Sequence, residues 1–552
     1  MKFSGNVKSK IINNKNANIW LASKNITVKY KDLILSMSEE EIDKFFSNNK
    51  LGFGTAGIRA TAGPGTNQMN KFTYQQMSEG FSKWILNKAA DPVVIVAHDN
   101  RKNADYYAMV VAETLTSFGV KVILYKDNQI KATPIVSYSV RSANADGAII
   151  VTASHNPKNY LGFKVYGRSG GQILDDDANE IIANMPECET IVNNRYTPNH
   201  DLISYFDDEI TENYFLASHR CLIKTELNRE KSFPVILTPH HGTACYDLPK
   251  LLRSLGYSNI ILAAQQANPD SNFTYSPSFN PEEKSSFNLS LKYAEKYGAS
   301  IMLGVDPDSD RLAVAVKHNN RWHYLTGNEM GIIFTYYVLS NKKFNKKPFI
   351  VSTFVSTNYI DRIAEKYNAD VYRTPTGFKW VGAEMEKYIN EKDFVVGFEE
   401  AIGSLNSDIG RDKDGFQASA LALEVFDYLF QQELTMIDYL NIIFEEFGAW
   451  SGETVSYKIE SLNWKEEMKE KMDKFSRIKN KDILGIRIEK IRWNERAQAL
   501  EWFLEQGSWI KFRLSGTEPK FKMYFDIYGP NKEITDKTLN SLKSELEFML
   551  RS

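Results

Sequence analysis

Cysteine is scarce in this chain: the 552 residues include three, Cys188, Cys221 and Cys245, and no two of them form a CxxC pair. This usage argues against a disulfide framework or a cysteine-rich zinc site and is typical of a reducing compartment. Net charge is also small, because 67 Lys and Arg residues stand against 69 Asp and Glu residues, giving −2. That balance argues against a general nucleic-acid-binding protein.

Long apolar runs are missing as well. No stretch approaches the roughly 18 uncharged apolar residues of a transmembrane helix, and residues 1–6 lack the apolar core of a secretory signal. The hydrophobic content of 43% and charged content of 25% are ordinary for a globular protein. We therefore expect a cytoplasmic enzyme without nucleic-acid or membrane partners, of roughly three to five domains.

From about residue 51, short apolar runs alternate with helical stretches, which predicts a largely parallel α/β sheet. In the first unit, strands are expected at 93–97, 120–125 and 147–151, with helices at 107–118 and 135–142. Two further units repeat the pattern over residues 234–305 and 330–397. Each unit ends in a strand that is followed by a polar loop, containing Ser154, Asp306 and Glu399 respectively.

These changes of pattern divide the chain into five segments. Residues 1–50 are polar and rich in Lys and Asn, so we expect an N-terminal extension, with Ser38 and Glu41 spaced as a capping box. After about residue 445, charged helical stretches and apolar runs suggest a smaller α+β domain. The predicted domains are 51–211 with the serine, 212–325 with the aspartates, 326–445 with the glutamates, and 446–552.

The hexapeptide 152–157 (Thr-Ala-Ser-His-Asn-Pro) follows a buried strand, where open α/β sheets place ligands. Ser154 as a helix N-cap is the ordinary alternative, but the residues after it resemble a loop. The sequence lacks G-x-S-x-G there, which argues against a hydrolase elbow. A phosphoserine fits better, because it can both donate phosphate and bind a metal.

Asp306, Asp308 and Asp310 alternate, so an extended backbone would direct all three carboxylates the same way. Converging carboxylates repel unless a cation such as Mg²⁺ binds them, and a phosphoseryl oxygen of Ser154 could complete its ligand sphere. A solvated turn is one alternative. An EF-hand is excluded, because Arg311 and Lys317 occupy the positions that need Gly and Glu.

Other loops offer groups for sugar and phosphate. Arg513 precedes Ser515-Gly516-Thr517, where hydroxyls, backbone amides and a guanidinium could grip phosphate, although an ordinary turn is possible. Glu399 could accept hydrogen bonds from sugar hydroxyls or lie in a solvated turn. Arg59 and Lys379 follow glycines and, taken singly, would be ordinary surface charges.

Together these motifs resemble the α-D-phosphohexomutase superfamily. The matching segments are 52–59 (GFGTAGIR), 152–157 (TASHNP), 162–164 (GFK), 306–311 (DPDSDR), 398–403 (FEEAIG) and 513–519 (RLSGTEP), in the order of the family. The resemblance implies three similar α/β domains and a C-terminal phosphate-binding domain around a central cleft. It also implies a mutase that moves phosphate between O1 and O6 of a hexose through a phosphoserine and a bisphosphate, with glucose 1,6-bisphosphate as activator.

The resemblance assigns roles to residues of this chain. Ser154 would carry the phosphate, and the catalytic set would be Ser154, His155, Lys164 and Arg59. Ser154 and the three aspartates would hold Mg²⁺, with Lys164 and His155 both candidates for the acid/base group. The substrate-binding set would be Arg311, Thr376, Gly377, Lys379, Glu399, Arg513, Ser515, Gly516 and Thr517.

Ala401 departs from the pattern, because many members of the family carry Ser there. The Ala form resembles the phosphoglucomutase-2-like and phosphopentomutase branch, which leaves glucose, mannose and pentose phosphates as possible substrates. The rival interpretations are a phosphopentomutase, a metal-dependent sugar phosphatase and a sugar-phosphate sensor. We expect sugar phosphates as partners and a monomer or homodimer.

Overall fold

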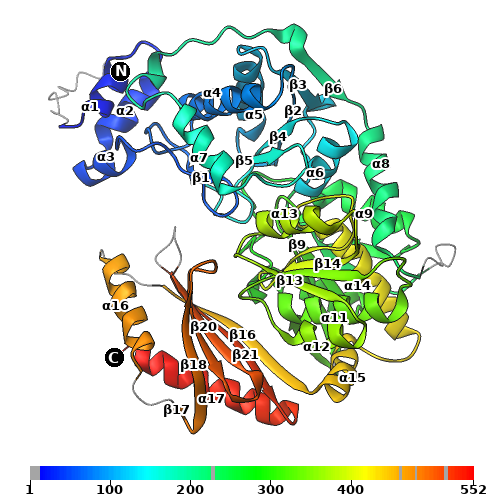
Figure 1. The fold of residues 1–552 in the computed structure, drawn as a ribbon. Helices are drawn as coiled ribbons and strands as arrows, with labels where there is room; N and C mark the ends of the chain where they lie inside the picture. The colour runs from blue at the N-terminus through cyan, green and yellow to red at the C-terminus, as the bar shows by residue number, and fades with distance from the viewer. Residues whose placement is uncertain (1–12, 225–230, 459–462, 479–481, 515–519, 552) are drawn as a thin grey trace.

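The computed structural model describes residues 13–224, 231–458, 463–478, 482–514 and 520–551. Its strands form four separate sheets of six, five, four and six strands in chain order (Figure 1). The predicted α/β class is confirmed: the first three sheets are mixed and the fourth is antiparallel. We propose the four predicted segments, each containing one sheet, as domains 1 to 4.

Domain 1 is built on a six-stranded sheet. Its order is β1 (Ile58–Thr61), β5 (Tyr160–Gly167), β4 (Gly147–Val151), β2 (Val93–His98), β3 (Lys121–Tyr125) and β6 (Ile203–Phe206). Strands β4, β2, β3 and β6 run parallel, whereas β5 is antiparallel to both β1 and β4. Every residue of β4 is buried, as its uninterrupted apolar run predicts for a strand covered on both faces.

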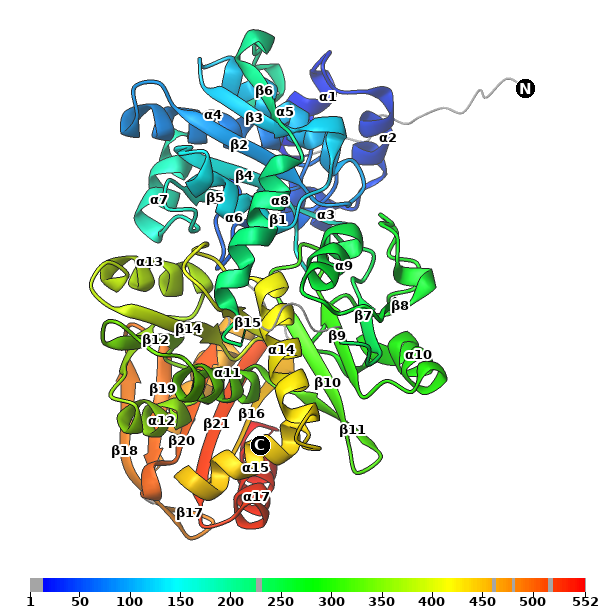
Figure 2. The same cartoon turned by 90° about the vertical axis from the view of Figure 1, so that its right-hand side faces the viewer.

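Helices cover both faces of this sheet. They are α4 (Lys71–Lys88), α5 (Ala104–Thr116), α6 (Thr133–Ser142) and α7 (Asp175–Asn184). Helices α4, α5 and α7 pack on the face of the sheet that presents Val94 and Val96. Helix α6 packs on the opposite face, which presents Ile95 and Ile150. Figure 2 shows α8 (Glu209–Ser218) running from β6 toward domains 2 and 3, so this helix carries the chain out of domain 1.

Domain 2 has a similar arrangement with five strands. The order is β11 (Arg321–Leu325), β10 (Leu312–His318), β9 (Ile301–Val305), β7 (Val235–Thr238) and β8 (Ile260–Leu262). Strands β9, β7 and β8 are parallel, and β9, β10 and β11 form an antiparallel meander. Helix α9 (Ala244–Ser254) packs on one face and α10 (Asn288–Tyr297) on the other.

Domain 3 is built on four strands. The order is β13 (Asp370–Thr374), β12 (Pro348–Thr353), β14 (Asp393–Glu399) and β15 (Gly403–Leu405), of which β15 is antiparallel. Its helices are α11 (Gly327–Asn341), α12 (Tyr359–Lys366), α13 (Phe378–Tyr388), α14 (Gly415–Phe430) and α15 (Met436–Phe447). The strand that precedes the predicted sugar loop, β14, lies inside this sheet, between β12 and β15.

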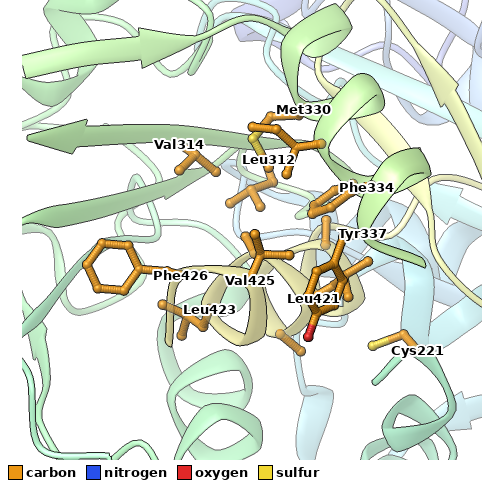
Figure 3. Packing of buried hydrophobic residues seen from close by; sticks show 14 of the residues in the cluster. Cys221, Leu312, Val314, Met330, Phe334, Tyr337, Leu421, Leu423, Val425 and Phe426 are labelled. Carbon is orange, nitrogen blue, oxygen red and sulfur yellow. The ribbon is translucent and has the colours of Figure 1, made fainter. Parts of the chain in front are cut away.

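Domains 2 and 3 share one hydrophobic core. Leu312 and Val314 of β10 pack with Phe334 of α11 and with Leu421 and Val425 of α14 (Figure 3). Each fully buried side chain of this kind stabilises the fold by about 1.5–3 kcal/mol. The loops at the ends of β9 and β14 are therefore carried by one packed unit.

Domain 4 is an antiparallel sheet covered by helices, which confirms the predicted α+β texture. The order is β16 (Ala449–Lys458), β21 (Lys520–Gly529), β20 (Trp509–Leu514), β19 (Ala499–Leu504), β18 (Ile486–Asn494) and β17 (Asp482–Ile483). The helices are α16 (Trp464–Ser476) and α17 (Lys532–Arg551). Met468 and Leu542 of these helices pack with Trp502 and Phe512 of the sheet.

The N-terminal segment, expected as a polar extension with one capping box, is folded. Three helices, α1 (Lys15–Ala22), α2 (Val28–Ser36) and α3 (Glu39–Phe45), enclose a small core around Trp20 that also contacts Phe72 of domain 1. Widely spaced apolar residues build this core, and the polar composition conceals them. The predicted capping box is confirmed, because Ser38 and Glu41 exchange both hydrogen bonds.

Among the described residues, no helix has the length and apolar character needed to cross a membrane.

Candidate active site

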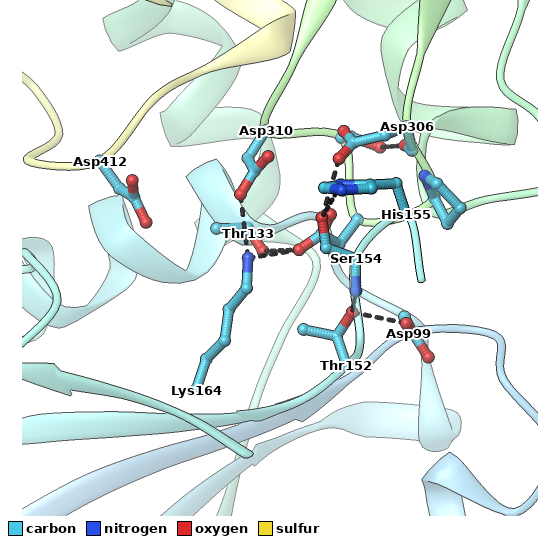
Figure 4. Close-up of polar contacts among 12 residues, drawn as sticks. Asp99, Thr133, Thr152, Ser154, His155, Lys164, Asp306, Asp310 and Asp412 are labelled. Carbon is cyan, nitrogen blue, oxygen red and sulfur yellow. Dashed lines mark hydrogen bonds and ion pairs between the residues drawn. The ribbon is translucent and has the colours of Figure 1, made fainter. Parts of the chain in front are cut away.

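Ser154 lies three residues after β4, in a loop rather than at a helix N-terminus. Its backbone is left-handed, with φ of 51°, and its amide donates to the Thr152 hydroxyl at 2.9 Å. This conformation is uncommon for a residue with a Cβ and is maintained here by surrounding contacts. The buried Ser154 Oγ donates to Asp306 Oδ2 of domain 2 at 3.0 Å (Figure 4).

Asp99 and Arg101, which the sequence analysis did not select, hold the Ser154 loop (residues 152–160). Thr152 donates to Asp99 Oδ2 at 2.6 Å (Figure 4), and Arg101 Nε lies 3.3 Å from the same oxygen. The Arg101 guanidinium also donates, over 2.5 to 3.0 Å, to the carbonyls of Ser154, Asn156, Pro157 and Tyr160. Asp99 and Arg101 could have been predicted as site residues from the sequence, because they follow directly after the strand predicted at 93–97.

Asp306, Asp308 and Asp310 converge as predicted: all three are buried, and one oxygen of each lies within 4.8 Å of the others. The predicted cause is wrong, because the backbone of this metal loop (residues 306–310) is not extended. It forms a turn in which Ser309 has φ of 63° and donates its amide to the Asp306 carbonyl at 2.9 Å. The turn, rather than strand alternation, brings the carboxylates together.

Two buried lysines lie against the aspartates. Lys164 Nζ is 2.5 Å from Asp308 Oδ2 and 2.9 Å from Asp310 Oδ2, and Lys413 Nζ is 2.9 Å from Asp310 Oδ2. Burial disfavours the Asp310 carboxylate, but the two lysines outweigh it and hold the pKa of Asp310 well below its usual value. Burial and the neighbouring carboxylates instead hold the pKa of Asp306 well above its usual value. The lysines therefore stabilise the Asp310 carboxylate but do not offset burial and repulsion at Asp306.

A divalent cation fits this cluster. The Oδ1 atoms of Asp308 and Asp310 are buried without a hydrogen-bond partner in the described part of the chain. A buried, unpaired carboxylate oxygen is costly, and hard cations such as Mg²⁺ bind carboxylate oxygens. The arrangement thus supports a metal site at the three aspartates.

Lys413 is a second residue that the sequence analysis missed. It belongs to the run Arg411-Asp412-Lys413-Asp414, whose four alternating charges are all buried. Asp412 accepts hydrogen bonds from Tyr166 and Gln172 of domain 1, while Lys413 reaches Asp310 of domain 2. A charge run usually indicates a solvated surface, so the contacts that bury this one could not be inferred locally.

Of the other residues in the predicted catalytic set, His155 lies beside the Ser154 hydroxyl and Arg59 contacts the Ser154 loop at Asn156. His155 Nδ1 is 3.3 Å from Ser154 Oγ, and Arg59 donates to Asn156 Oδ1 at 2.6 Å. Burial, together with the charges of Arg311 and Arg59, holds the pKa of His155 well below its usual value. The imidazole is therefore neutral near pH 7.

Arg311 joins the metal loop to the predicted sugar loop (residues 398–403). Its Nη1 donates to the Ala401 carbonyl at 3.1 Å, and its backbone bridges to Gly403. Glu399, at the end of β14, is 6% exposed. Burial raises the pKa of Glu399 to about 7, although Arg311 and Lys413 oppose this shift. This carboxyl consequently titrates near neutral pH.

Thr376, Gly377 and Lys379 lie at a different contact between domains 1 and 3. Lys379 Nζ is 2.5 Å from Asp175 Oδ1 at the start of α7. Gly377 has φ of 113°, and a Cβ added there would lie 2.7 Å from Thr55 Cγ2. The structure therefore places these residues against α7 and the turn that precedes β1, not among the aspartates.

Arg513 lies at the end of β20, and its Nε is buried without a hydrogen-bond partner among the described residues. The Tyr524 phenol is affected by Arg513. Burial raises the pKa of Tyr524, the charge of Glu400 raises it further, and Arg513 lowers it. Glu400 of the sugar loop and Arg513 therefore both act on the Tyr524 phenol. Ser515, Gly516 and Thr517 lie outside the described residues.

Glu399 leads to a testable pH dependence of stability. Between pH 4.5 and about 7 the folded chain keeps the Glu399 proton while the unfolded chain loses it, so stability falls as pH rises. The shift corresponds to about 3 kcal/mol, which Glu399→Gln abolishes. The test is calorimetry in EDTA at pH 5 and at pH 8. From pH 5 to pH 8, the thermal transition temperature of Glu399→Gln should rise by several degrees relative to that of the wild-type protein. A constant difference between the two proteins would contradict the prediction.

Comparison with known proteins gives the family. Residues 50–191, 212–320 and 326–446 match the models of phosphoglucomutase/phosphomannomutase alpha/beta/alpha domains I, II and III. The chain is 43% identical to a phosphomannomutase of Mycoplasmoides pirum, covering 98% of this chain and 100% of that protein. It is 28% identical to a phosphoglucomutase of Staphylococcus epidermidis, over 92% of this chain and 96% of the relative.

Solved structures show the same fold. Parafusin, a phosphoglucomutase from Paramecium in its open form, has a TM-score of 0.70 at 17% identity, covering 91% of this chain and 94% of parafusin. A phosphoglucomutase/phosphomannomutase family protein from Burkholderia thailandensis has a TM-score of 0.66 at 18% identity, covering 90% of this chain and 97% of that one. The chain belongs to the phosphoglucomutase/phosphomannomutase family of hexose phosphate mutases, within the α-D-phosphohexomutase superfamily.

Proposed function

We propose that this chain interconverts hexose 1-phosphates and hexose 6-phosphates through a phosphorylated Ser154. The observation that carries the proposal is the 3.0 Å contact between Ser154 Oγ and Asp306 of the buried aspartate cluster. In the first half-reaction, phospho-Ser154 would transfer its phosphoryl group to the free hydroxyl of the hexose phosphate. The resulting bisphosphate would turn round, and Ser154 would take back the other phosphoryl group. Glucose 1,6-bisphosphate would act as activator by phosphorylating Ser154.

The residues around Ser154 support a division of tasks. His155, with Nδ1 at 3.3 Å from Ser154 Oγ, is placed to accept the proton that a sugar hydroxyl loses as it attacks. Charge develops on the transferring phosphoryl group, and fixed cations that face it are the main catalytic need. Arg59, Arg311 and Lys164 lie around the Ser154 and metal loops and would supply this positive charge.

We propose Mg²⁺ as the ion held by Asp306, Asp308, Asp310 and a phosphoryl oxygen on Ser154. When bound, the ion would withdraw negative charge from the phosphoryl group that is transferred. Lys164 contacts Asp308 and Lys413 contacts Asp310, so the two lysines would hold these carboxylates in place around the ion.

The substrate's other groups would be bound by domains 3 and 4. We assign sugar hydroxyls to Glu399, and the nontransferred phosphate to Arg513 with the loop Ser515-Gly516-Thr517. Thr376, Gly377 and Lys379 would contribute from the contact between domains 1 and 3. We also propose, from the cysteine usage of the sequence, that the enzyme works in the cytoplasm.

We infer the preferred sugar from the names of the relatives. Those of 38 to 43% identity are named phosphomannomutases, and those of 28 to 29% are named phosphoglucomutases. We therefore propose both mannose and glucose phosphates as substrates. The test is kcat/KM measured side by side for mannose 1-phosphate, glucose 1-phosphate and ribose 1-phosphate. Preference for ribose 1-phosphate would instead identify a phosphopentomutase, and stoichiometric phosphate release would identify a phosphatase.

Arg513→Ala should raise KM and lower kcat together. The guanidinium would grip the phosphate that does not react, and part of that binding energy positions the reacting end. Loosely bound bisphosphate should also escape more often, measured as free glucose 1,6-bisphosphate per turnover. Arg487→Ala, which removes an exposed arginine of the same sheet, is the control. If Arg513→Ala matches this control in KM, kcat and leakage, Arg513 has no role in binding.

A further inference from the structure

Residues 100–101 of domain 1 contact a long loop of domain 2, the 267–279 loop. Asn100 Nδ2 donates to the Asp270 carbonyl at 3.1 Å. The Arg101 guanidinium carbon lies over the Phe273 ring, 5.5 Å from its centroid, and Phe273 is 2% exposed. An arginine over an aromatic face is attracted by the ring quadrupole, more strongly when both are shielded from water.

The 267–279 loop is built to hold Phe273 in that place. Phe273 has a left-handed φ of 52°, and its amide donates to the Asp270 carbonyl at 3.0 Å. The Asp270 carboxylate accepts from the amides of Asn272 and Thr274 at 2.8 and 3.0 Å. A bulky residue with this φ is strained, and such strain persists only where surrounding contacts impose it. An aromatic residue that only filled the core would not need a left-handed backbone conformation.

The same loop is attached to the segment that supports the aspartates. His241, just after β7, contacts the Asn268 carbonyl through Nδ1 at 2.9 Å and accepts the Tyr275 amide at Nε2 at 3.3 Å. Two residues later, Thr243 donates its amide to the Pro307 carbonyl of the metal loop at 2.8 Å. Residues 241–243 therefore connect the metal loop on one side with the 267–279 loop on the other.

We propose that Phe273 is a positioning residue for phosphoryl transfer. Its ring holds the Arg101 guanidinium, which holds four carbonyls of the Ser154 loop, so that the nucleophile of domain 1 is placed against the aspartates of domain 2. This inference rests on the proposed function, because it takes Ser154 as the group that reacts. Displacing a reacting group by a fraction of an ångström lowers the rate without weakening sugar binding.

The experiment replaces the aromatic face while keeping an apolar side chain. Phe273→Leu should lower kcat about tenfold and leave KM within about twofold, because positioning and not binding is lost. Phe273→Met should behave alike. The matched control is Phe279→Leu, which removes the ring packed on Phe273 at 4.7 Å and so loosens the same loop. Phe279→Leu should keep kcat within about threefold of the wild-type value. Its thermal transition temperature should change by about as much as that of Phe273→Leu.

A second measurement does not depend on catalysis. Hydrogen exchange followed by mass spectrometry should show faster exchange of the backbone amides of residues 152–160 in Phe273→Leu, and wild-type exchange in Phe279→Leu. Wild-type exchange in both variants, or equal acceleration in both, would overturn the proposal. If the wild-type protein shows no mutase activity, the proposed function fails, and the exchange comparison still decides whether Phe273 positions the Ser154 loop.

Discussion

Ser154→Ala is expected to lower kcat by at least about three orders of magnitude, the scale of removing a group that forms a covalent intermediate. The reason is chemical, because the remaining residues of the site can bind and polarise a phosphate but cannot carry it between the two half-reactions. The protein should still fold. The lost hydroxyl donates one hydrogen bond, to Asp306, and the amide of residue 154 keeps its bond to Thr152.

Intact-mass and phosphopeptide measurements test the covalent step directly. After incubation with glucose 1,6-bisphosphate, the wild-type chain should gain one phosphate at Ser154, and Ser154→Ala should gain none. Ser82→Ala is the matched control, since it removes a buried hydroxyl of α4 in the same domain, and it should be phosphorylated like wild type. Full mutase activity of wild-type protein without phosphate at Ser154 would exclude the mechanism.

Most of the fold could be predicted because its signals are local. The apolar run at 147–151 and the helix expected at 135–142 depend on neighbouring residues, and both lie close to where they were expected, as β4 and α6. The first two N-terminal helices and their core were missed because Trp20 and the other apolar residues of that core are widely spaced in a polar segment. The core that β10 shares with α11 and α14 could not be predicted either, since it depends on how two domains pack together.

The candidate site divides in the same way. The motifs around Ser154 and Asp306 were found because each is a compact segment after a strand. Lys413 and Arg101 were not, because their partners lie more than 50 residues away in the chain. Even the correct convergence of the aspartates was predicted for the wrong reason, since a turn at Ser309 was not expected where alternation suggested an extended strand.

Asp308→Asn should abolish most activity and also remove the stabilisation by Mg²⁺, which makes the metal role testable without a substrate. Asp308 Oδ1 is buried and has no hydrogen-bond partner among the described residues, while Oδ2 lies 2.5 Å from Lys164 and accepts from Thr133 at 3.1 Å. An amide oxygen can keep those two contacts, but the amide group carries no charge to bind a divalent ion. The apo variant should therefore unfold near the wild-type temperature.

Calorimetry with EDTA and with excess Mg²⁺ measures this difference. An ion that binds only the folded chain raises its stability by about 2.7 kcal/mol at a hundredfold excess over Kd, so the wild-type transition should rise. Asp308→Asn should show little rise in transition temperature on adding Mg²⁺.

Asp412→Asn is the matched control, because Asp412 is a buried carboxylate 3.5 Å from Lys413 and is not one of the three aspartates. Its transition temperature should respond to Mg²⁺ as that of the wild-type protein does. An equal response of Asp308→Asn and wild type would contradict the metal site, as would full wild-type activity in excess EDTA. Because the same lysines contact the cluster in all three proteins, the difference isolates the one carboxylate that is proposed to bind the ion.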